Sequence, residues 1–203
     1  MHTNPAFRTV SLAENLAFAR QRGFGILMLN GVDGPLASHI PFVLAEDGLS
    51  AELHLTRSNP IARAAPGPAL LAVSGPDAYI SPDWYGLEDQ VPTWNYVAVH
   101  LRGRLSEMDI GLMKDHVDAL SAVHETGLLP KKPWHSDKMS EGTLPRMMRM
   151  ILPFRLLITS VEGTWKLNQN KPDEARAKAA DALCAQPGAG AQAIAGLMRR
   201  RTD

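Results

Sequence analysis

Apolar and polar residues alternate along several stretches of this chain, which is the pattern of β-strands buried on one face. The alternation is clearest from Leu49 to Thr56. From Ala69 to Val73 the run is apolar throughout, which is typical of a central strand, and Ser74-Gly75-Pro76 is expected to turn the chain after it. About six strands are therefore expected, at residues 24–29, 36–44, 49–56, 69–73, 94–102 and 154–163.

Turn and helix signals complete this pattern. Asn30-Gly31 and Asp33-Gly34 indicate a hairpin between the first two strands, and Pro41 predicts that the second strand lacks a neighbouring strand at that position. Helical spacing predicts helices at residues 11–22, 60–65, 109–127, near 147–150, from 173 and after 190. Strands joined by short turns predict an α+β fold, mainly antiparallel, in which the sheet curls into a small barrel with peripheral helices.

The strand that begins at Trp94 has two very different faces. Val97, Val99 and Leu101 form an ordinary core face, whereas Trp94 and Tyr96 lie on the other face with Ala98, His100 and Arg102. An aromatic and partly polar face of this kind suits a partner subunit, a flat ligand, or both.

Composition and charge exclude several classes of protein. The 203 residues include 21 basic and 21 acidic side chains, so the chain lacks the excess of positive charge that is typical of proteins that bind nucleic acid. Cys184 is the sole cysteine, which excludes an intrachain disulfide. No apolar run approaches the roughly 18 residues that span a bilayer, and the N-terminus lacks a signal-peptide pattern. We expect a soluble, cytoplasmic protein.

The segment Thr56-Arg57-Ser58-Asn59-Pro60 is the best candidate for a phosphate site. It offers a guanidinium, two hydroxyls and the backbone N–H groups of a helix that Asn59 caps and Pro60 begins. The alternative is a strand-to-helix turn with an exposed arginine.

Other candidates are weaker. His39, His54 and His100 lie on expected strands, but no spacing matches a metal site, and no residue stands out as a general acid or base. The methionines at 147, 148 and 150 are typical of flexible core filling. Trp94, Trp165 and Lys166 either flank a planar ligand or belong to aromatic filling of a barrel mouth or dimer seam.

Five longer motifs occur in order along about residues 5–185 of the chain: Ser38-His-Ile-Pro-Phe42, His54-Leu-Thr-Arg-Ser-Asn-Pro60, Gly75-Pro-Asp-Ala-Tyr-Ile-Ser-Pro-Asp-Trp-Tyr85, Val91-Pro-Thr-Trp-Asn-Tyr96 with Val99-His100, and Glu162-Gly-Thr-Trp-Lys-Leu-Asn-Gln-Asn170. With these motifs the chain resembles the PaiB-type family of FMN-binding negative transcriptional regulators. The resemblance implies a split β-barrel with Greek-key-like connections at residues 1–185, followed by an Ala/Gly-rich helical tail at 186–203.

The resemblance also implies a homodimer that binds FMN in the seam between its subunits. It assigns the phosphate to Thr56, Arg57, Ser58 and Asn59. The isoalloxazine ring and pocket would be lined by Ser38, His39 and Pro41, by Trp94, Asn95 and Tyr96, and by Trp165, Lys166 and Gln169. Thr56 and Ser58 stand where the family often has small apolar residues, which adds polar groups to the expected phosphate site. Asn168 stands where serine is common.

Two functions follow from the resemblance. The first is a flavin-dependent oxidoreductase-like protein, and the second is a flavin-sensing transcriptional regulator. The alternatives are a non-catalytic regulator that acts through a partner or metabolite, and a haem-binding relative. The even charge balance argues against direct binding to DNA.

Overall fold

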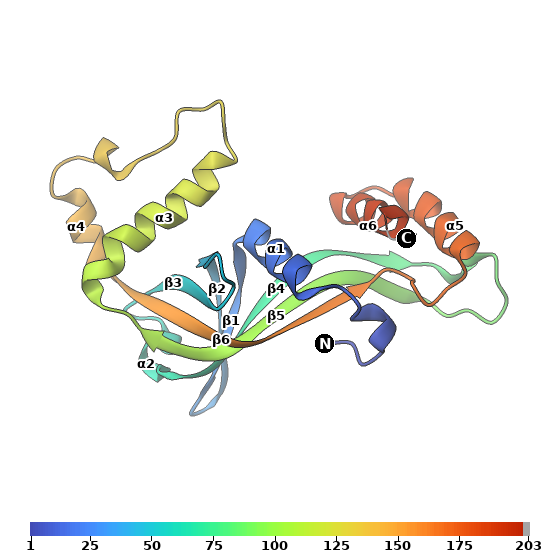
Figure 1. Ribbon diagram of the computed structural model, residues 1–203, viewed down its shortest axis with the longest axis horizontal. Helices are drawn as coiled ribbons and strands as arrows, with labels where there is room; N and C mark the ends of the chain where they lie inside the picture. The colour runs from blue at the N-terminus through green and yellow to red at the C-terminus, as the bar shows by residue number, and fades with distance from the viewer. Residues whose placement is uncertain (201–203) are drawn as a thin grey trace. The chain divides into compact units, whose positions relative to one another are not determined.

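The computed structural model describes residues 1–200, which contain six strands and six α-helices (Figure 1). The strands are β1 (Phe24–Gly31), β2 (Gly34–Leu44), β3 (Ser50–Thr56), β4 (Gly67–Ile80), β5 (Thr93–Glu107) and β6 (Ile151–Lys166). The helices are α1 (Leu12–Arg22), α2 (Pro60–Ala64), α3 (Met113–Thr126), α4 (Thr143–Met148), α5 (Asp173–Cys184) and α6 (Ala189–Arg200). Short 3₁₀ turns are η1 (Pro5–Phe7), η2 (Pro82–Tyr85), η3 (Ile110–Leu112) and η4 (Ser136–Lys138).

The strands form a closed barrel in the order β1-β2-β3-β6-β5-β4. The pairs β1–β2, β1–β4, β2–β3 and β3–β6 are antiparallel. The chain crosses from β3 to β4 and returns through β5 to β6 beside β3, which is a Greek-key-like connection. The predicted α+β fold, with six strands curled into a barrel, is confirmed.

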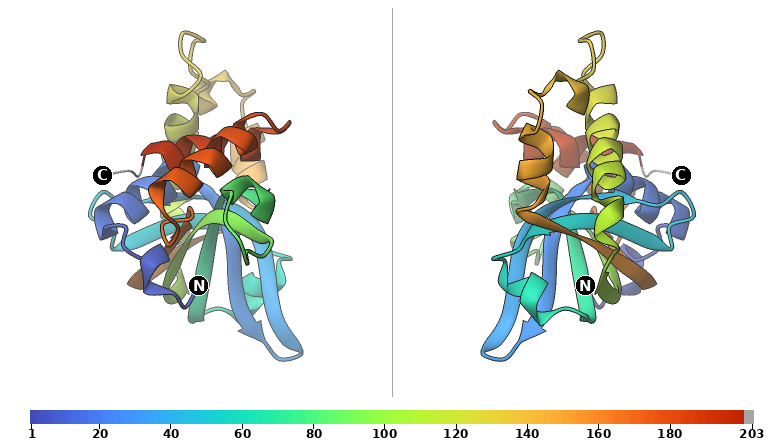
Figure 2. Two further views of the ribbon diagram at one scale, coloured as in Figure 1. Left: turned by 90° about the vertical axis from the view of Figure 1, so that its right-hand side faces the viewer. Right: turned by 90° about the vertical axis from the view of Figure 1, so that its left-hand side faces the viewer.

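The β1–β2 hairpin is also as predicted (Figure 2). Gly31 pairs with Gly34, so only Val32 and Asp33 form the turn. Pro41 is the last residue of β2 before the pairing with β3 begins at Phe42. The N–H of Phe42 points to β1, so the nitrogen of Pro41 points to the β3 side, where no ladder bond is needed.

The turn predicted at Ser74-Gly75-Pro76 is wrong. β4 runs without interruption through these residues to Ile80. The φ of proline is compatible with extended backbone, and a residue that precedes proline is itself driven into the extended region. A Gly-Pro pair therefore does not have to end a strand.

The chain divides into two compact units, each with its own core. The barrel unit comprises residues 16–73 and 100–161, and the second unit comprises residues 1–15, 74–99 and those from 162 onward. No helix among residues 1–200 is long and apolar enough to cross a membrane. The barrel core is built from inward side chains of the strands, among them Leu27, Phe42, Leu53, Leu71, Leu101, Leu105, Phe154 and Leu156.

The second unit contains the packed helix pair α5 and α6, which lie side by side in Figure 1. Its core includes Tyr85 from η2, whose hydroxyl donates to the side-chain oxygen of Asn168 at 3.3 Å. Ile194 and Met198 are the buried anchors of α6. The predicted tail helix is thus a packed element of this unit, and residues 201–203 lie outside the described part of the chain.

Helix α3 buries Met113, His116 and Leu120 in the barrel unit. On the same helix Val117 is half-buried and His124 is exposed. The side chain of His116 is 1% exposed, and its Nε2 lies 3.1 Å from Nδ1 of His54 on β3. The two imidazoles therefore join α3 to the outer face of β3.

A charged pair flanks these histidines. Arg155 of β6 donates to Glu52 of β3 at 2.7 Å, and the other carboxylate oxygen of Glu52 is 4.0 Å from Nδ1 of His116. The pKa of His116 is lowered to about 4, chiefly by burial and then by the charge of His54, against the opposing effect of Glu52. Burial also lowers the pKa of His54. The pair is therefore neutral at pH 7.

We expect the protein to lose stability as the pH falls from about 6.5 to about 4, because the unfolded chain binds a proton that folded His116 excludes. The full effect is on the order of 3 kcal/mol. The check is the free energy of unfolding in denaturant across this pH range, for the wild type and for His116→Gln. This variant should show a flatter dependence on pH, whereas His124→Gln on the exposed face of α3 should keep the wild-type slope. An unchanged slope in His116→Gln would contradict the assignment.

Candidate functional site

The segment Thr56–Pro60 connects β3 to α2 as predicted. The side-chain oxygen of Asn59 accepts the N–H of Ile61 at 2.9 Å, and Pro60 is the first helical residue. The amide nitrogen of Asn59 donates to the hydroxyl of Ser38 on β2 at 3.0 Å. Two parts of the predicted site that are 21 residues apart are therefore in direct contact.

Arg57 is held by the backbone that leads into β6. Its N–H donates to the carbonyl of Met150 at 3.0 Å, and its Nε donates to the carbonyl of Arg149 at 2.6 Å. No carboxylate is bonded to Arg57 within the described residues, so its terminal nitrogens are available to an anion. The exposed hydroxyls of Thr56 and Ser58 are 3.4 Å apart beside it. This donor set, with no acidic partner, fits a phosphate group.

The outer face of the β1–β2 pair presents a flat surface. The exposed His39 stacks on the exposed ring of Phe24, with centroids 6.5 Å apart and an interplanar angle of 28°. Pro41 lies directly opposite Phe24 in the strand register. Ser38 is on the other face of β2, toward Asn59, so it does not share this surface.

The aromatic face predicted for β5 is confirmed in the second unit. Trp94 is 55% exposed, and its ring contacts the 46% exposed Tyr79 edge-on at 6.2 Å. Tyr96 is half-buried on the same face. Asn95 is fully buried on the opposite face, where its amide nitrogen lies 3.4 Å from the sulfur of Met198. Asn95 therefore does not line the surface that carries Trp94 and Tyr96.

Two of the site residues predicted at the end of β6 form hydrogen bonds within the protein that leave their polar groups occupied. Trp165 is buried, and its indole N–H donates to the side-chain oxygen of Asn15 at 2.9 Å. The side chain of Gln169 accepts the N–H of Leu167 and donates to the carbonyl of Trp165. These bonds fix the turn that follows β6.

Lys166 lies between these buried groups and the surface. Its ammonium donates to the hydroxyl of Thr93 and, at 2.8 Å, to the carbonyl of Trp94. Burial, followed by the charge of Lys171, lowers the pKa of Lys166. Lys166 thus fixes the first residues of β5 and brings positive charge close to the exposed Trp94.

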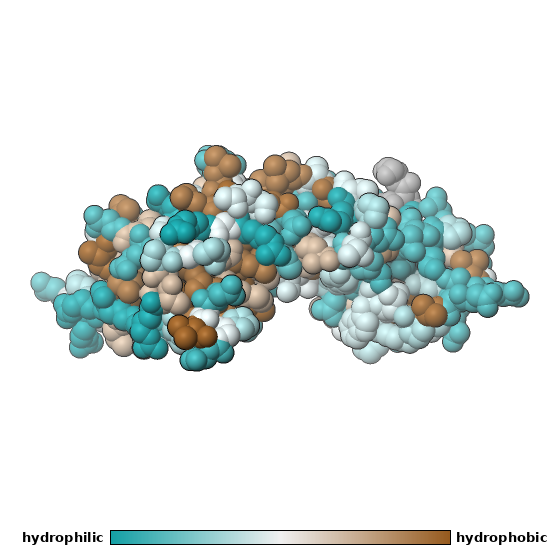
Figure 3. All heavy atoms as spheres, turned by 90° about the horizontal axis from the view of Figure 1, so that it is seen from below, coloured by the Kyte–Doolittle hydropathy of each residue, from teal (hydrophilic) through white to brown (hydrophobic). Residues whose placement is uncertain are grey.

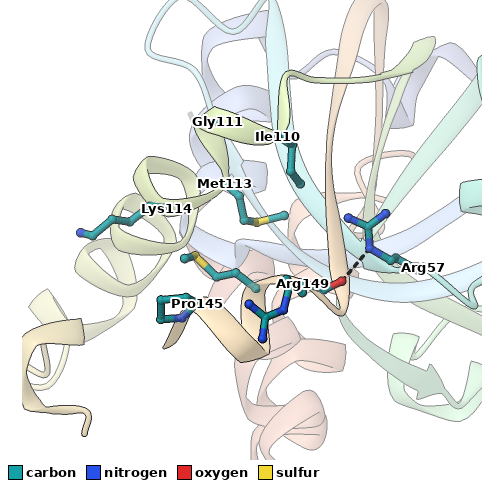
Figure 4. Close-up of a pocket in the computed structure, with 8 residues that line it drawn as sticks. Arg57, Ile110, Gly111, Met113, Lys114, Pro145 and Arg149 are labelled. Atoms are coloured by element: carbon teal, nitrogen blue, oxygen red, sulfur yellow. Dashed lines mark hydrogen bonds between the residues drawn. The ribbon is translucent and has the colours of Figure 1, made fainter. Parts of the chain in front are cut away.

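A cavity of about 310 Å³ in the barrel unit adjoins Arg57 (Figure 4). It is lined by Arg57, Ile110, Gly111, Met113, Lys114, Pro145, Met148 and Arg149. No local sequence pattern marks this cavity, and the predicted role of the methionines as core filling is wrong. Met147 and Met150 are 53% and 66% exposed, and Met148 faces the cavity.

Of the two groups that were not predicted, His116 and Arg149, only His116 has a signal in the sequence. His116 follows Met113 by three residues and precedes Leu120 by four, which places it on one helical face with both. Nothing local to Arg149 marks it, because its relation to Arg57 depends on the pairing of strands far apart in the chain.

Two solved structures of proteins named for flavin or haem have a similar fold. The FAD and heme binding protein from Mycobacterium smegmatis matches with a TM-score of 0.57 and 15% identity, over 79% of this chain and 73% of that one. The flavocytochrome Anf3 from Azotobacter vinelandii matches with a TM-score of 0.59 and 13% identity, over 81% and 72%. At this level of identity the likeness concerns the fold alone.

Comparisons of the sequence identify relatives. A Bacillus subtilis (strain 168) protein named Protease synthase and sporulation protein PAI 2 is 29% identical over 175 residues, which cover 84% of this chain and 83% of that protein. An uncharacterized protein of Saccharomyces cerevisiae is 36% identical over 98 residues, which cover 42% of this chain and 58% of that protein.

A family model described as "Putative FMN-binding domain" matches residues 1–160. The family and the flavin cofactor predicted from the motifs are thereby confirmed, and the donor set at Thr56–Asn59 fits the phosphate of FMN. The chain belongs to this family of FMN-binding domains.

Proposed function

We propose that this protein is an FMN-dependent redox protein that acts as a homodimer. The observation that carries the proposal is the group of exposed donors at Thr56, Arg57 and Ser58, which has no acidic partner within residues 1–200. When bound, FMN supplies one-electron and two-electron redox chemistry. The residues of the chain bind and orient the cofactor.

The phosphate is assigned to Arg57 with the hydroxyls of Thr56 and Ser58. The bond from Arg57 Nε to a backbone carbonyl orients the guanidinium before any anion arrives, so little side-chain entropy is lost on binding. Asn59 has a supporting role, because its side chain caps α2 and bonds Ser38. The segment is therefore a preformed anion site.

Each unit has its own exposed flat groups that suit contact with an isoalloxazine ring, and each set is a separate candidate. In the barrel unit these are His39, beside Phe24, and Pro41. In the second unit they are Trp94 and Tyr96, with Lys166 fixing the backbone beneath. Trp165, Asn95 and Gln169 support this second set from within the same unit, through their buried or bonded side chains.

His39 is the best candidate for proton transfer. It is exposed on the surface assigned to the ring, whereas His54 is covered by α3 and bonded to His116. Histidine is the side chain that most often transfers protons in general acid–base catalysis.

The dimer is inferred from the aromatic pair of Trp94 and Tyr79. The face drawn in Figure 3 shows hydrophobic residues in separate small patches among hydrophilic ones, rather than one large apolar surface. A pair of large exposed rings is the kind of anchor that a partner subunit buries.

Regulation of transcription is the second candidate function. It is favoured by the name of the Bacillus subtilis relative, which links that protein to protease synthesis and sporulation. The chain has 21 basic and 21 acidic residues, so it lacks the positive charge needed to bind DNA phosphates strongly. A regulatory role would therefore act through a partner or a metabolite.

The purified protein is expected to show the visible absorbance of bound FMN, and anaerobic NADH or NADPH is expected to bleach it. Release of the chromophore and its identification complete the measurement. A colourless protein that also fails to bind added FMN would contradict the cofactor assignment, and a Soret band would favour haem. Bound FMN that neither donor bleaches would favour the regulatory function over the redox one.

Replacement of Arg57 by alanine should weaken FMN binding about tenfold to a hundredfold, since charge-assisted hydrogen bonds are worth about 1.5–3 kcal/mol. Affinity is measured by titration of flavin fluorescence, with FMN and with riboflavin, which lacks the phosphate. The loss should be confined to FMN. Arg63→Ala, at an exposed arginine of α2, is the matched control. If Arg57→Ala keeps full FMN affinity, the phosphate lies elsewhere.

The variant Trp94→Glu is expected to convert dimers to monomers, because a carboxylate cannot be buried unpaired at the partner surface. Sedimentation analysis gives the oligomeric state. Val32→Glu replaces a fully exposed apolar residue at the β1–β2 turn and should leave the dimer intact. A wild-type monomer, or a dimeric Trp94→Glu, would refute the proposed interface.

A further inference from the structure

The cavity beside Arg57 has a largely apolar wall. Ile110 and Met113 line it from η3 and α3, and Pro145 and Met148 line it from α4 (Figure 4). Its volume of about 310 Å³ is at the small end of the range for ligand sites, roughly 300–1,000 Å³. Methionine side chains adapt to different apolar shapes, so this wall suits a compact apolar group.

Three cations border this apolar wall, and no carboxylate is among the lining residues. Lys114 is already paired, with its ammonium 2.5 Å from the carboxylate of Asp118. Arg57 and Arg149 have no carboxylate partner within residues 1–200. Two like charges beside one apolar cavity repel each other, and a bound anion would relieve that repulsion.

We infer that this cavity binds a small amphipathic carboxylate, with its apolar body between Met113 and Met148 and its acid group at Arg149 and Arg57. A guanidinium matches the planar carboxylate with two parallel hydrogen bonds. The inference rests on the geometry of the barrel unit and not on the proposed redox function. It shares only Arg57 with the proposed phosphate site.

The lining distinguishes this ligand from FMN. The hydroxyls of Thr56 and Ser58, which the phosphate assignment requires, do not line the cavity. Most of the wall is hydrocarbon and thioether, which offers an anion no hydrogen bond but suits the apolar body of a ligand. A single carboxylate on an apolar body needs fewer hydrogen-bond donors than a phosphate does.

Arg149 is the residue that tests the site, because it lines the cavity and has no part in the proposed phosphate site. Arg146 lies three residues earlier on α4, is also exposed, and does not line the cavity. The two arginines therefore form a matched pair in which only one should affect the ligand.

Calorimetric titration of the full chain with octanoate tests the inference, in the presence and in the absence of FMN. Octanoate should bind, 1-octanol should bind at least about tenfold more weakly, and octylamine should not bind. Absence of octanoate binding, or equal binding of octylamine, would overturn the inference. Because FMN affinity is measured separately, failure of the cofactor proposal and failure of this site are distinguished.

Arg149→Ala should weaken octanoate binding at least about tenfold and leave FMN affinity unchanged, whereas Arg146→Ala should alter neither. Selective ¹³C labelling of the nine methionine methyl groups gives a second readout. Octanoate should shift the signals of Met113 and Met148 but not that of Met198, which is buried in α6. Wild-type octanoate affinity in Arg149→Ala, or shifts that spare Met113 and Met148, would overturn the assignment.

Discussion

The pairing of β3 with β6 is the constraint on which both proposed sites depend. The register runs from Ser50 opposite Leu157 to Thr56 opposite Ile151. The ladder does not stop there, because the N–H of Arg57 bonds the carbonyl of Met150, and its side chain bonds the next carbonyl, that of Arg149. One strand pair therefore helps to close the barrel, ends at the phosphate segment, and positions a guanidinium at the rim of the neighbouring cavity.

The other side of β6 is equally restricted. A Cβ added to Gly103 of β5 would lie 1.8 Å from the carbonyl oxygen of Leu157, so only glycine allows the two backbones to come this close. Thr159 adds a bond from its hydroxyl to the carbonyl of Arg102 at 3.3 Å. Between β3 and β5, this part of β6 has little freedom to shift register. The positions of Arg57 and Arg149 are consequently properties of the barrel and not of a flexible loop.

Much of the fold was predictable because its causes are local. Alternation located the strands, and the side-chain cap of Asn59 with Pro60 after it located α2. The same period-two rule separated Trp94 and Tyr96 from the buried side of β5. Local rules failed where tertiary packing decided the outcome: β4 continues through Gly75-Pro76, and His116 is buried because α3 covers the outer face of β3.

The candidate site was predictable only in part, for the same physical reason. The motifs assigned Arg57 to the phosphate and Ser38 to the isoalloxazine ring, and the bond between Ser38 and Asn59 joins those motifs in space. Arg149 is separated from Arg57 by 92 residues, and no spacing in the sequence relates them. Their proximity follows from strand register, which is set by the pairing of backbones and by the packing of buried faces together. The sequence thus identifies the FMN-binding family. The strand register, in contrast, forms the cavity next to the proposed phosphate site and positions the two arginines that are proposed to bind a second ligand.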